Sequence, residues 1–474
     1  MAPDTTTPTS AAATVAALVQ RARAAQATFE QWSQERTDEA CLAVGWAIMQ
    51  PQRNRDLAAL AVRDTGLGVA ADKVVKNHRK TLGLLRDIRG AVSKGVLAEH
   101  PDTGITEIAR PVGVVAAVVP STNPAATPAN NIINALKCGN AVIVSPSPKG
   151  QTTCAALLGH IHAGLAKVGA PADLVQMLPA PATKELSQEL MRQADLVVIT
   201  GSQANVRAGY SSGTPALGVG AGNVAVIVDD TADLADAAAK IMVSKTFDNA
   251  TSCSSENSAV IHAAVYERML AALTAAGGAL LTADEKAQLQ KAMFPGGKLS
   301  PAVTAQSVAK ICALAGLTRP ALVSAQCLMV EDGGSGREHP YSGEKLSPVL
   351  TLYRADDFGQ AFAIVRGIYA YQGNGHSVGI HTANEDHVRR LGHEMTVCRV
   401  IVNQAHAIAN GGSFDNGLPF SLTMGCGTWG GNSFSENLNY RHFMNVTRIA
   451  RPIPPREPSV DEIFGEFWKK HGND

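Results

Sequence analysis

The sequence predicts an α/β fold with two Rossmann-like domains, each built on an open parallel sheet, and a smaller β element. Short apolar runs of strand length alternate with longer stretches of helical spacing, in two successive series along the chain. Parallel strands need a crossover between them, which is usually a helix. A chain of 474 residues is also too long for one core. We therefore expect two sheets in two domains.

The first series begins with a helical stretch. Residues 11–50 carry apolar side chains at helical spacing with Arg, Gln and Glu between them. Residues 100–110 alternate towards their end and predict an edge hairpin, and Asn130–Lys137 predicts a helix. The strands that we expect in this series are 111–119, 141–144, 174–178, 194–200 and 224–228.

The second series starts near Lys245. Residues 411–437 are rich in Gly, Ser and Asn and predict a long irregular loop, which in compact enzymes is usually functional. The alternating run 444–449 predicts a last strand, followed by Pro-rich coil. The strands that we expect here are 259–262, 349–353, 377–381 and 400–403, and the helices include 355–367 and 385–394.

Composition and charge exclude several classes of protein. Basic and acidic residues balance at 41 each, which leaves no electrostatic footprint for nucleic acid or an anionic membrane. No apolar run approaches the roughly 20 residues that span a bilayer. The Thr/Pro-rich residues 1–10 lack the features of a signal peptide and predict a frayed tail. The eight cysteines form no CxxC pair, so we expect free thiols in the cytoplasm and no metal site.

Cys253 lies in an unusual context for a packing residue. The stretch 247–257 reads FDNATSCSSEN, so the neighbours of the thiol offer hydroxyl and amide donors instead of methyl groups. If a helix begins just before Cys253, its dipole lowers the thiol pKa and favours the thiolate. The alternative is a buried structural cysteine, which is the commoner fate of this residue type.

Two further segments have the chemistry of a ligand-binding loop. Ser202 follows a strand and precedes a helix, where it caps the helix and leaves N–H groups that suit a phosphate. Gly218, Gly220 and Gly222 allow the backbone to approach a ligand or another strand closely, although their spacing is not G-x-G-x-x-G. An ordinary helix cap and a tight structural turn are the alternatives for these two segments.

Taken together and in order, these segments resemble the aldehyde dehydrogenase superfamily over nearly the whole chain. The resemblance extends to 109–124 (ARPVGVV…PSTNP), 138–148 (CGNAVIVSPSP), 344–349 (EKLSPV) and 425–433 (GCGTWGGNS). The last string is the most specific. It is similar to the CoA-acylating branch, including the aldehyde half of bifunctional acetaldehyde/alcohol dehydrogenases.

The resemblance implies roles for individual residues. It makes Cys253 the nucleophile and Glu344 the residue that holds the nicotinamide ribose. Asn123 is implied as the side-chain donor to the oxyanion, with Thr122 as the alternative, because an ungapped alignment of the loop puts Thr122 at the family's Asn position. The implied cofactor-binding residues are Pro120, Ser145, Pro146, Ser147, Gly201, Ser202, Gly218, Val219, Gly220 and Glu344.

The same resemblance implies an aldehyde dehydrogenase-like division of the chain. Residues 1–100 and 111–242 are expected to form the dinucleotide-binding domain, and residues 243–437 the catalytic domain. Residues 101–110 and 438–474 are expected to form an oligomerisation hairpin and a C-terminal tail. The assembly implied is a homodimer or homotetramer.

The sequence departs from the hydrolytic members of the family at the general base. Those members carry a Glu in the motif Glu-Leu-Gly-Gly-Lys, whereas Gly218 occupies the matching position in Leu217–Gly222. Water needs a positioned base to open a thioester, but a thiol with a pKa of roughly 8.5 already supplies some thiolate at pH 7. We therefore expect coenzyme A, as co-substrate, to release an acyl-CoA. Glu256 is the alternative base, which would release a free acid.

A second departure concerns the nicotinamide cofactor. Where the family has a Glu that binds the adenosine ribose, this chain reads Ser145-Pro-Ser-Pro148. Without that carboxylate, NAD and NADP are both open. Lys149 lies just beyond and suits a 2′-phosphate or simple solvation.

The residues around the nucleophile indicate a small polar or anionic aldehyde. Ser252 and Ser254 flank Cys253, and the strings 249–258 and 412–423 are similar to those of acylating sulfoacetaldehyde dehydrogenases. Further candidate substrate or anion partners are His406, Thr423, Arg110 and Arg441. Acetaldehyde, propionaldehyde and succinic semialdehyde are alternative substrates, and reductive use is an alternative direction. A catalytically silent cofactor-binding oligomer is the alternative outside enzymes.

Overall fold

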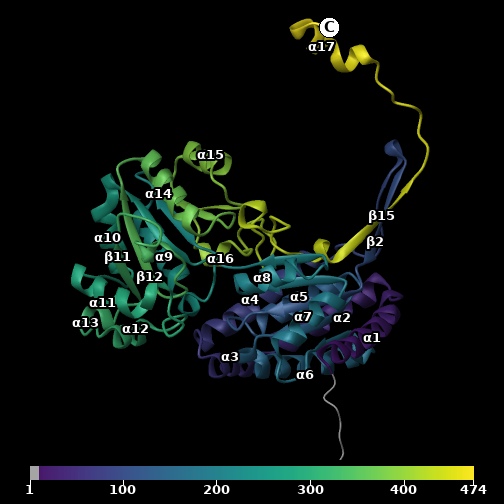
Figure 1. The fold of residues 1–474 in the computed structure, drawn as a ribbon, viewed down its shortest axis with the longest axis horizontal. Coiled ribbons are helices and arrows are strands. Elements are labelled where there is room, and N and C mark those ends of the chain that lie inside the picture. Colours follow the sequence, from purple (N-terminus) through teal and green to yellow (C-terminus); the bar gives the residue numbers. More distant parts are fainter. Residues whose placement is uncertain (1–9, 474) are drawn as a thin grey trace, which may run out of the picture.

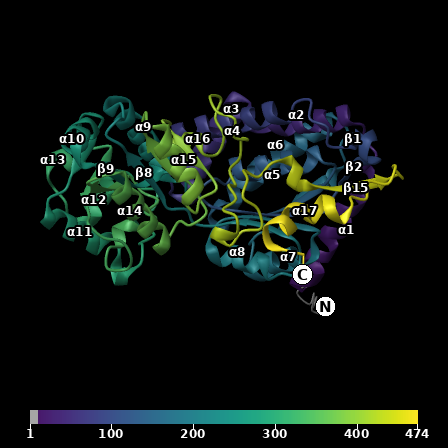
Figure 2. The ribbon, with the colours of Figure 1, turned by 90° about the horizontal axis from the view of Figure 1, so that it is seen from above.

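The computed structural model describes residues 10–473 and confirms the α/β class. The expected Thr/Pro-rich tail at 1–9 lies outside the described residues. Two parallel sheets, of five and seven strands, form two lobes that lie side by side, and a three-stranded antiparallel sheet projects from the first lobe (Figures 1 and 2). No helix between residues 10 and 473 has the length and apolar character needed to span a bilayer.

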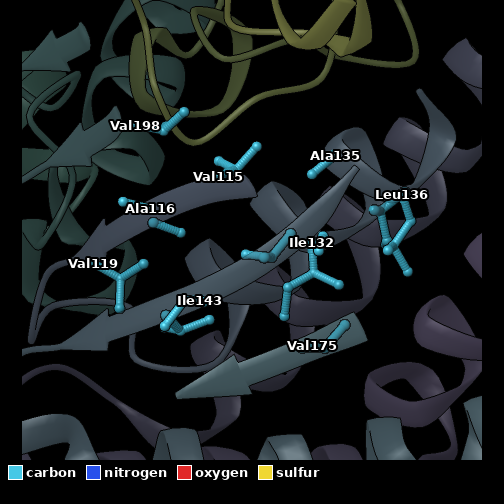
Figure 3. Close-up of a cluster of buried hydrophobic side chains, with 14 of the residues drawn as sticks. Val115, Ala116, Val119, Ile132, Ala135, Leu136, Ile143, Val175 and Val198 are labelled. Carbon is cyan, nitrogen blue, oxygen red and sulfur yellow. The ribbon is translucent and has the colours of Figure 1, made fainter. Parts of the chain in front are cut away.

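The first lobe is a parallel sheet covered by helices, with strand order β5-β4-β3-β6-β7. Its strands are β3 (Val114–Val119), β4 (Ala141–Pro146), β5 (Val175–Met177), β6 (Leu196–Thr200) and β7 (Ala216–Val219). Its helices are α1 (Ala11–Glu30), α2 (Gln34–Met49), α3 (Pro51–Thr65), α4 (Ala70–Ile88), α5 (Ala126–Lys137), α6 (Gln151–Lys167), α7 (Lys184–Gln193) and α8 (Gln203–Tyr210). Figure 3 shows part of its core, where Val115 and Ile143 of the sheet lie beside Ile132 of α5.

The strand order reverses between β3 and β6. The chain runs outward from β3 through β4 to β5, and α7 then returns it to β6 on the other side of β3. In open α/β sheets, ligands bind outside the carboxyl ends of the strands at such a switch point. The topology therefore predicts a ligand near Pro120 and Gly201, which follow β3 and β6.

The second lobe is a parallel sheet with strand order β10-β11-β12-β9-β8-β13-β14. Its strands are β8 (Val224–Val228), β9 (Glu256–His262), β10 (Gly278–Leu280), β11 (Cys327–Glu331), β12 (Val349–Ala355), β13 (Val378–His381) and β14 (Val400–Val402). Its helices are α9 (Leu234–Thr246), α10 (Tyr266–Ala275), α11 (Ala283–Met293), α12 (Val308–Ala315), α13 (Pro320–Val323), α14 (Phe358–Tyr371), α15 (Glu385–Glu394) and α16 (His406–Ala409).

The third sheet forms an arm. Strand β2 (Ile105–Pro111) pairs antiparallel with β1 (Gly95–His100) on one side and with β15 (Met444–Ala450) on the other. After β15 the chain extends away and ends in α17 (Val460–His471), which stands apart from both lobes in Figure 1 and buries no residue.

The sheets divide the chain at other residues than the expected domain boundaries. Strand β8 already pairs with β9 and β13, so the second sheet begins near 224 and not after 242. Phe420 and Phe434 pack in the core of the first lobe, so the second lobe does not continue to 437. The hairpin begins at β1 rather than at 101. An apolar run looks the same whichever sheet it joins, because its partners come from tertiary pairing.

Three expectations on helices also need correction. Residues 11–50 are broken into α1 and α2, because the Ser33 hydroxyl accepts a hydrogen bond from the Arg36 N–H and begins a new helix. The Pro-rich tail ends in the helix α17, whose capping box of Ser459 and Glu462 is a signal the sequence did contain. No helix begins just before Cys253: α9 ends at Thr246, and a single 3-10 turn at Phe247–Ala250 ends before the nucleophile, which lies in the turn that leads to β9.

Candidate active site

A cavity of about 390 Å³ lies where the two lobes meet. From the first lobe it is lined by Pro120, Gly201 and Gly220, which follow the carboxyl ends of β3, β6 and β7. From the second lobe it is lined by Cys253 and Glu344, which precede the amino ends of the paired strands β9 and β12. Two sheets of parallel strands thus present opposite ends to one space, and the cavity occupies the switch point of the first sheet.

Cys253 is one of two cysteines that are not buried, and it faces this cavity. It lies in a turn rather than at a helix N-terminus, so the dipole expected to favour its thiolate is missing. Burial from water raises the pKa of the Cys253 thiol to about 12, and the nearby Glu344 carboxylate raises it further in the same direction. The thiol is therefore protonated at neutral pH in the free protein.

Asn123 and Thr122 both line the cavity, in the loop that follows β3. The Lys76 ammonium donates to Asn123 Oδ1 at 2.9 Å. With Oδ1 held by a cation, the amide nitrogen points the other way, where it makes only a long 3.4 Å contact to Thr122 Oγ1. The backbone oxygen of Thr122 accepts from Lys73 at 2.9 Å. Asn123 is thus oriented as a donor, which favours it over Thr122 for the oxyanion.

One buried carboxylate holds these two lysines. Asp248 Oδ2 accepts hydrogen bonds from Lys76 at 2.5 Å, Lys73 at 3.0 Å and the Thr251 hydroxyl at 2.7 Å. The lysines keep the pKa of Asp248 low despite its burial. The network joins α4, the Thr122–Asn123 loop and the turn that carries Cys253.

The turn before Cys253 has an uncommon backbone. Asp248, Asn249 and Ala250 have φ values of 53°, 51° and 58°, in the left-handed region that residues with a Cβ rarely adopt. The Asp248 N–H donates to Asp72 at 2.7 Å and the Asn249 amide donates to the Ala305 oxygen at 3.2 Å. These contacts from other elements hold the strained turn, and with it the nucleophile.

Glu344 is the acidic residue among the described residues that line the cavity. Its Oε1 accepts a hydrogen bond at 3.1 Å from the N–H of Gly222, in the link between β7 and β8. Burial raises the pKa of Glu344 to about 8, while Gly222 and the cations Lys245 and Lys345 oppose that rise. The carboxyl group is therefore tied to the joint between the two sheets.

Comparison with known proteins identifies this architecture. The Aldehyde dehydrogenase family profile matches residues 3–319. This chain belongs to the aldehyde dehydrogenase family. It is 62% identical over 462 residues to sulfoacetaldehyde dehydrogenase (acylating) of Cupriavidus necator, with 98% of this chain and 94% of the relative covered. It is 42% identical over 464 residues to a protein of the same name from Bilophila wadsworthia, covering 97% of this chain and 99% of the relative.

The fold agrees with that assignment. The crystal structure of an acetylating aldehyde dehydrogenase from Geobacillus thermoglucosidasius superposes with a TM-score of 0.91 at 31% identity, over 95% of this chain and 98% of the other. The family resemblance read from the sequence is thereby confirmed, together with the aldehyde dehydrogenase-like fold.

Most of the site residues expected from the sequence of this aldehyde dehydrogenase meet in the cavity. Ser252 and Ser254 line it beside Cys253, and the Ser254 hydroxyl accepts from the Asn410 amide at 2.9 Å. The expected residues that line it are Pro120, Thr122, Asn123, Gly201, Ser202, Gly220, Ser252, Cys253, Ser254 and Glu344. The expected residues that do not are Ser145, Pro146, Ser147, Gly218, Val219, His406 and Thr423.

Four residues expected as substrate or anion partners contact other parts of the protein. His406 is buried behind the cavity, where its ring bonds the Ser377 hydroxyl at 2.8 Å. The Thr423 hydroxyl is buried against that of Thr200 at 2.5 Å. Arg110 pairs with Glu30 on the outer side of the arm, and Arg441 is exposed beside Tyr440. None of these four residues lines the cavity, so nothing in its wall supports the expectation that they bind an anion there.

Two positions bear on a general base: position 218, where hydrolytic relatives carry a Glu, and Glu256. Neither faces the cavity. A Cβ at Gly218 would lie 3.0 Å from Val206 Cγ1 and 3.2 Å from Tyr210 Cε2, so position 218 faces α8. Glu256 does not line the cavity, and its carboxylate accepts from the Ser244 hydroxyl and from the His406 N–H at 3.3 Å. The hydrolytic alternative based on Glu256 therefore lacks a geometry that would support it.

The sequence analysis missed the basic residues of α4. Lys76, Arg79 and Lys80 line the cavity, and Lys73 lies one turn earlier behind Thr122. A signal existed: Lys73, Lys76 and Lys80 occupy the buried stripe of α4, the positions where an amphipathic helix ordinarily carries apolar side chains. Across the described chain, from 10 to 473, no group of three or more His, Cys, Asp or Glu is arranged to hold a metal ion.

Proposed function

We propose that this aldehyde dehydrogenase is CoA-acylating and oxidises an aldehyde to an acyl-CoA through a thioester on Cys253. The observation that carries the proposal is the wall of the cavity. Among the described residues that line it, Glu344 is the single carboxylate, and it already accepts the Gly222 N–H. Water needs a positioned base to open a thioester, whereas a thiol supplies its own thiolate near neutral pH. A cavity without a free carboxylate base therefore favours CoA over water as the nucleophile that opens the thioester.

In the first step the Cys253 thiol loses its proton to solvent and its sulfur forms a C–S bond with the aldehyde carbon, while the C=O π bond breaks and the carbonyl oxygen becomes an oxyanion. Two donors suit that oxygen: the amide nitrogen of Asn123 and the N–H of Cys253, which bonds no other group in residues 10–473. After oxidation, the CoA thiolate attacks the thioester carbon. The acyl-CoA leaves, and the Cys253 thiolate is restored.

The carboxyl ends of β3 and β6 suit NAD or NADP, which supplies the hydride acceptor for the oxidation. Ser202 caps α8 through a 3.3 Å bond from the Asn205 N–H, and the free N–H groups of that helix end suit a phosphate. A Cβ at Gly220 would lie 2.6 Å from the end of the exposed Gln203 side chain, so glycine lets Gln203 lie against the backbone at the same helix end. Glu344 would hold the nicotinamide ribose, and Ser145–Ser147 the adenosine side.

The substrate we propose is sulfoacetaldehyde, in the direction of sulfoacetyl-CoA. Both relatives described above bear the name of sulfoacetaldehyde dehydrogenase (acylating). The cavity agrees in charge with an anionic aldehyde, because its described wall has three cations, Lys76, Arg79 and Lys80, against the one carboxylate of Glu344.

We propose that the protein works as a homodimer or homotetramer in the cytoplasm. The arm supports an assembly, since β15 is an edge strand of a sheet whose side chains are largely exposed. The cytoplasm is supported by the eight cysteines, all of which are free thiols. Light scattering on the purified protein measures the mass of the assembly directly, and a monomer would contradict this part of the proposal.

The test of the acylating function is reduced-cofactor formation, followed by absorbance, with sulfoacetaldehyde in the presence and absence of CoA. We expect turnover that requires both CoA and Cys253, so Cys253→Ala abolishes it. The matched control is Cys398→Ala, which removes the other cysteine that is not buried and should leave turnover intact. Turnover without CoA would overturn the proposal. Activity with acetaldehyde or succinic semialdehyde alone would keep the acylating mechanism and reject the substrate.

A further inference from the structure

The cations of α4 that line the cavity are not equivalent. Lys76 has a buried carboxylate partner, because Asp248 Oδ2 lies 2.5 Å from its ammonium. Arg79 and Lys80 have no carboxylate within hydrogen-bonding distance in the described part of the chain. An ion without a hydrogen-bonded counter-ion in a water-poor space is unfavourable, and a bound anion would remove that cost.

Lys80 is the clearer case. The residue is buried, with 8% of its surface exposed, and its ammonium donates to one group, the backbone oxygen of Gly411. An ammonium has three N–H donors, so two remain for a ligand. A Cβ at position 411 would lie 2.6 Å from Lys80 Nζ, so glycine at 411 leaves the ammonium its space.

Arg79 lies beside Lys80 and is held in place by neutral acceptors. It donates to the Ile408 oxygen at 3.1 Å and to the Ser413 hydroxyl at 2.7 Å. These two bonds use two of the five N–H donors of the guanidinium. Both bonds come from the segment 408–413, which leads into the loop that covers this end of the cavity.

The two cations share one cavity with the nucleophile. Cys253 lines the same cavity as Arg79 and Lys80, and a Cys253 thiolate is among the charges that act on the Lys80 ammonium. Sulfoacetaldehyde has a single methylene between sulfur and the carbonyl carbon. Its anionic group must therefore lie close to the thiol when the carbonyl is attacked, within the cavity that Lys80 and Arg79 share with Cys253. The carboxylates that act on these cations, Asp415 on Arg79 and Asp87 on Lys80, make no hydrogen bond to either.

We propose that Arg79 and Lys80 form the subsite that binds the sulfonate of the substrate and thereby select an anionic aldehyde over a neutral one. This inference rests on the proposed function for the identity of the substrate. A sulfonate presents three acceptor oxygens, which match the free N–H donors of the ammonium and the guanidinium. Lys76 has a different role, because Asp248 and Asn123 Oδ1 already occupy it.

Phosphate groups of CoA or of the nicotinamide cofactor have the same chemistry as a sulfonate, and kinetics separate the sources. The variants are Lys80→Met and Arg79→Met, compared with the control Arg89→Met, which removes an exposed cation just past the end of α4. For both variants we expect KM for sulfoacetaldehyde to rise about 10- to 100-fold, the loss of one charge-assisted hydrogen bond. KM for propionaldehyde, CoA and the cofactor should change by less than about 3-fold, within the uncertainty of such contacts.

Two kinetic results would overturn the subsite. Equal losses with sulfoacetaldehyde and propionaldehyde would mean that Arg79 and Lys80 only support the fold. A raised KM for CoA or for the cofactor, with that for the aldehyde unchanged, would assign the pair to a phosphate.

Binding of an inert sulfonate tests the subsite without turnover. We expect calorimetry to detect ethanesulfonate binding to the wild-type protein and at least about 10-fold weaker binding to Lys80→Met. Equal affinity for the two proteins, or no binding to the wild type, would refute the subsite. If the wild type binds ethanesulfonate but does not oxidise sulfoacetaldehyde, the proposed function fails while the subsite stands.

Discussion

The orientation of Asn123 by Lys76 gives a quantitative prediction. Replacing Lys76 with Met keeps the aliphatic part of the side chain but removes the ammonium that holds Asn123 Oδ1 at 2.9 Å. A hydrogen bond to a charged group contributes about 1.5–3 kcal/mol, and loss of a whole oxyanion donor lowers kcat about 10²- to 10³-fold. Because Lys76→Met leaves the Asn123 amide itself in place, we expect a smaller loss, with kcat lowered about 10- to 100-fold.

Stability should change much less than activity in Lys76→Met. Asp248 retains Lys73 at 3.0 Å and Thr251 at 2.7 Å, so its carboxylate does not become an unpaired buried charge. The free energy of unfolding should fall by about 1–2 kcal/mol, measured by denaturant titration. In contrast, Asp248→Asn leaves Lys73 and Lys76 without their anion and should destabilise the protein by about 3–5 kcal/mol.

A double-mutant cycle is the decisive assay. If Lys76 works by orienting Asn123, Lys76→Met should lower kcat by less than about 3-fold in an Asn123→Ala background, far below its effect in the wild type. The control is Lys73→Met, which removes an equal charge from Asp248 but contacts the backbone oxygen of Thr122 instead of the amide. Independent, multiplicative effects of Lys76→Met and Asn123→Ala would refute the orienting role.

Three further predictions concern titration and the base. Since burial raises the pKa of Cys253 to about 12, the thiolate fraction grows about tenfold per pH unit below that value. The rate of Cys253 alkylation by iodoacetamide in the free protein should therefore rise steadily from pH 7 to 9, and a plateau below pH 8 would contradict this. Besides burial, four charged groups affect the pKa of the Lys80 ammonium: Arg79, Lys76, Cys253 and Asp87. Burial first and the two cations next lower the pKa of Lys80 to about 7, so its charge is present below pH 7 and lost above it. KM for sulfoacetaldehyde should then rise between pH 6 and 8 in the wild type but not in Lys80→Met, and identical pH profiles would count against the sulfonate subsite. Glu256→Gln should keep turnover within about 3-fold and keep its dependence on CoA, because the amide oxygen can still accept from the His406 N–H while the amide nitrogen donates to the Ser244 hydroxyl. Loss of activity in this variant, with a free acid as the wild-type product, would restore Glu256 as a base.

Several parts of the fold could be read from the sequence because they depend on local patterns. The strands 141–144 and 400–403 and the helix 385–394 were predicted within a few residues of β4, β14 and α15. Hydrophobic periodicity reports such elements directly. The pattern could not say that β8 joins the second sheet or that residues near Phe420 return to the first lobe, since both depend on pairing between distant segments.

For the active site too, some features follow from the sequence and others only from the tertiary structure. The sequence by itself determined the family, the cysteine in its polar turn, and the glycine at 218 where hydrolytic relatives have a carboxylate, because these are properties of ordered motifs. Only the tertiary structure decided that the lysines of α4 face a cavity instead of water, since Asp248 lies 172 residues beyond Lys76 and Gly411 lies 331 beyond Lys80. Helical spacing specifies which residues share a face, and long-range packing determines what that face meets.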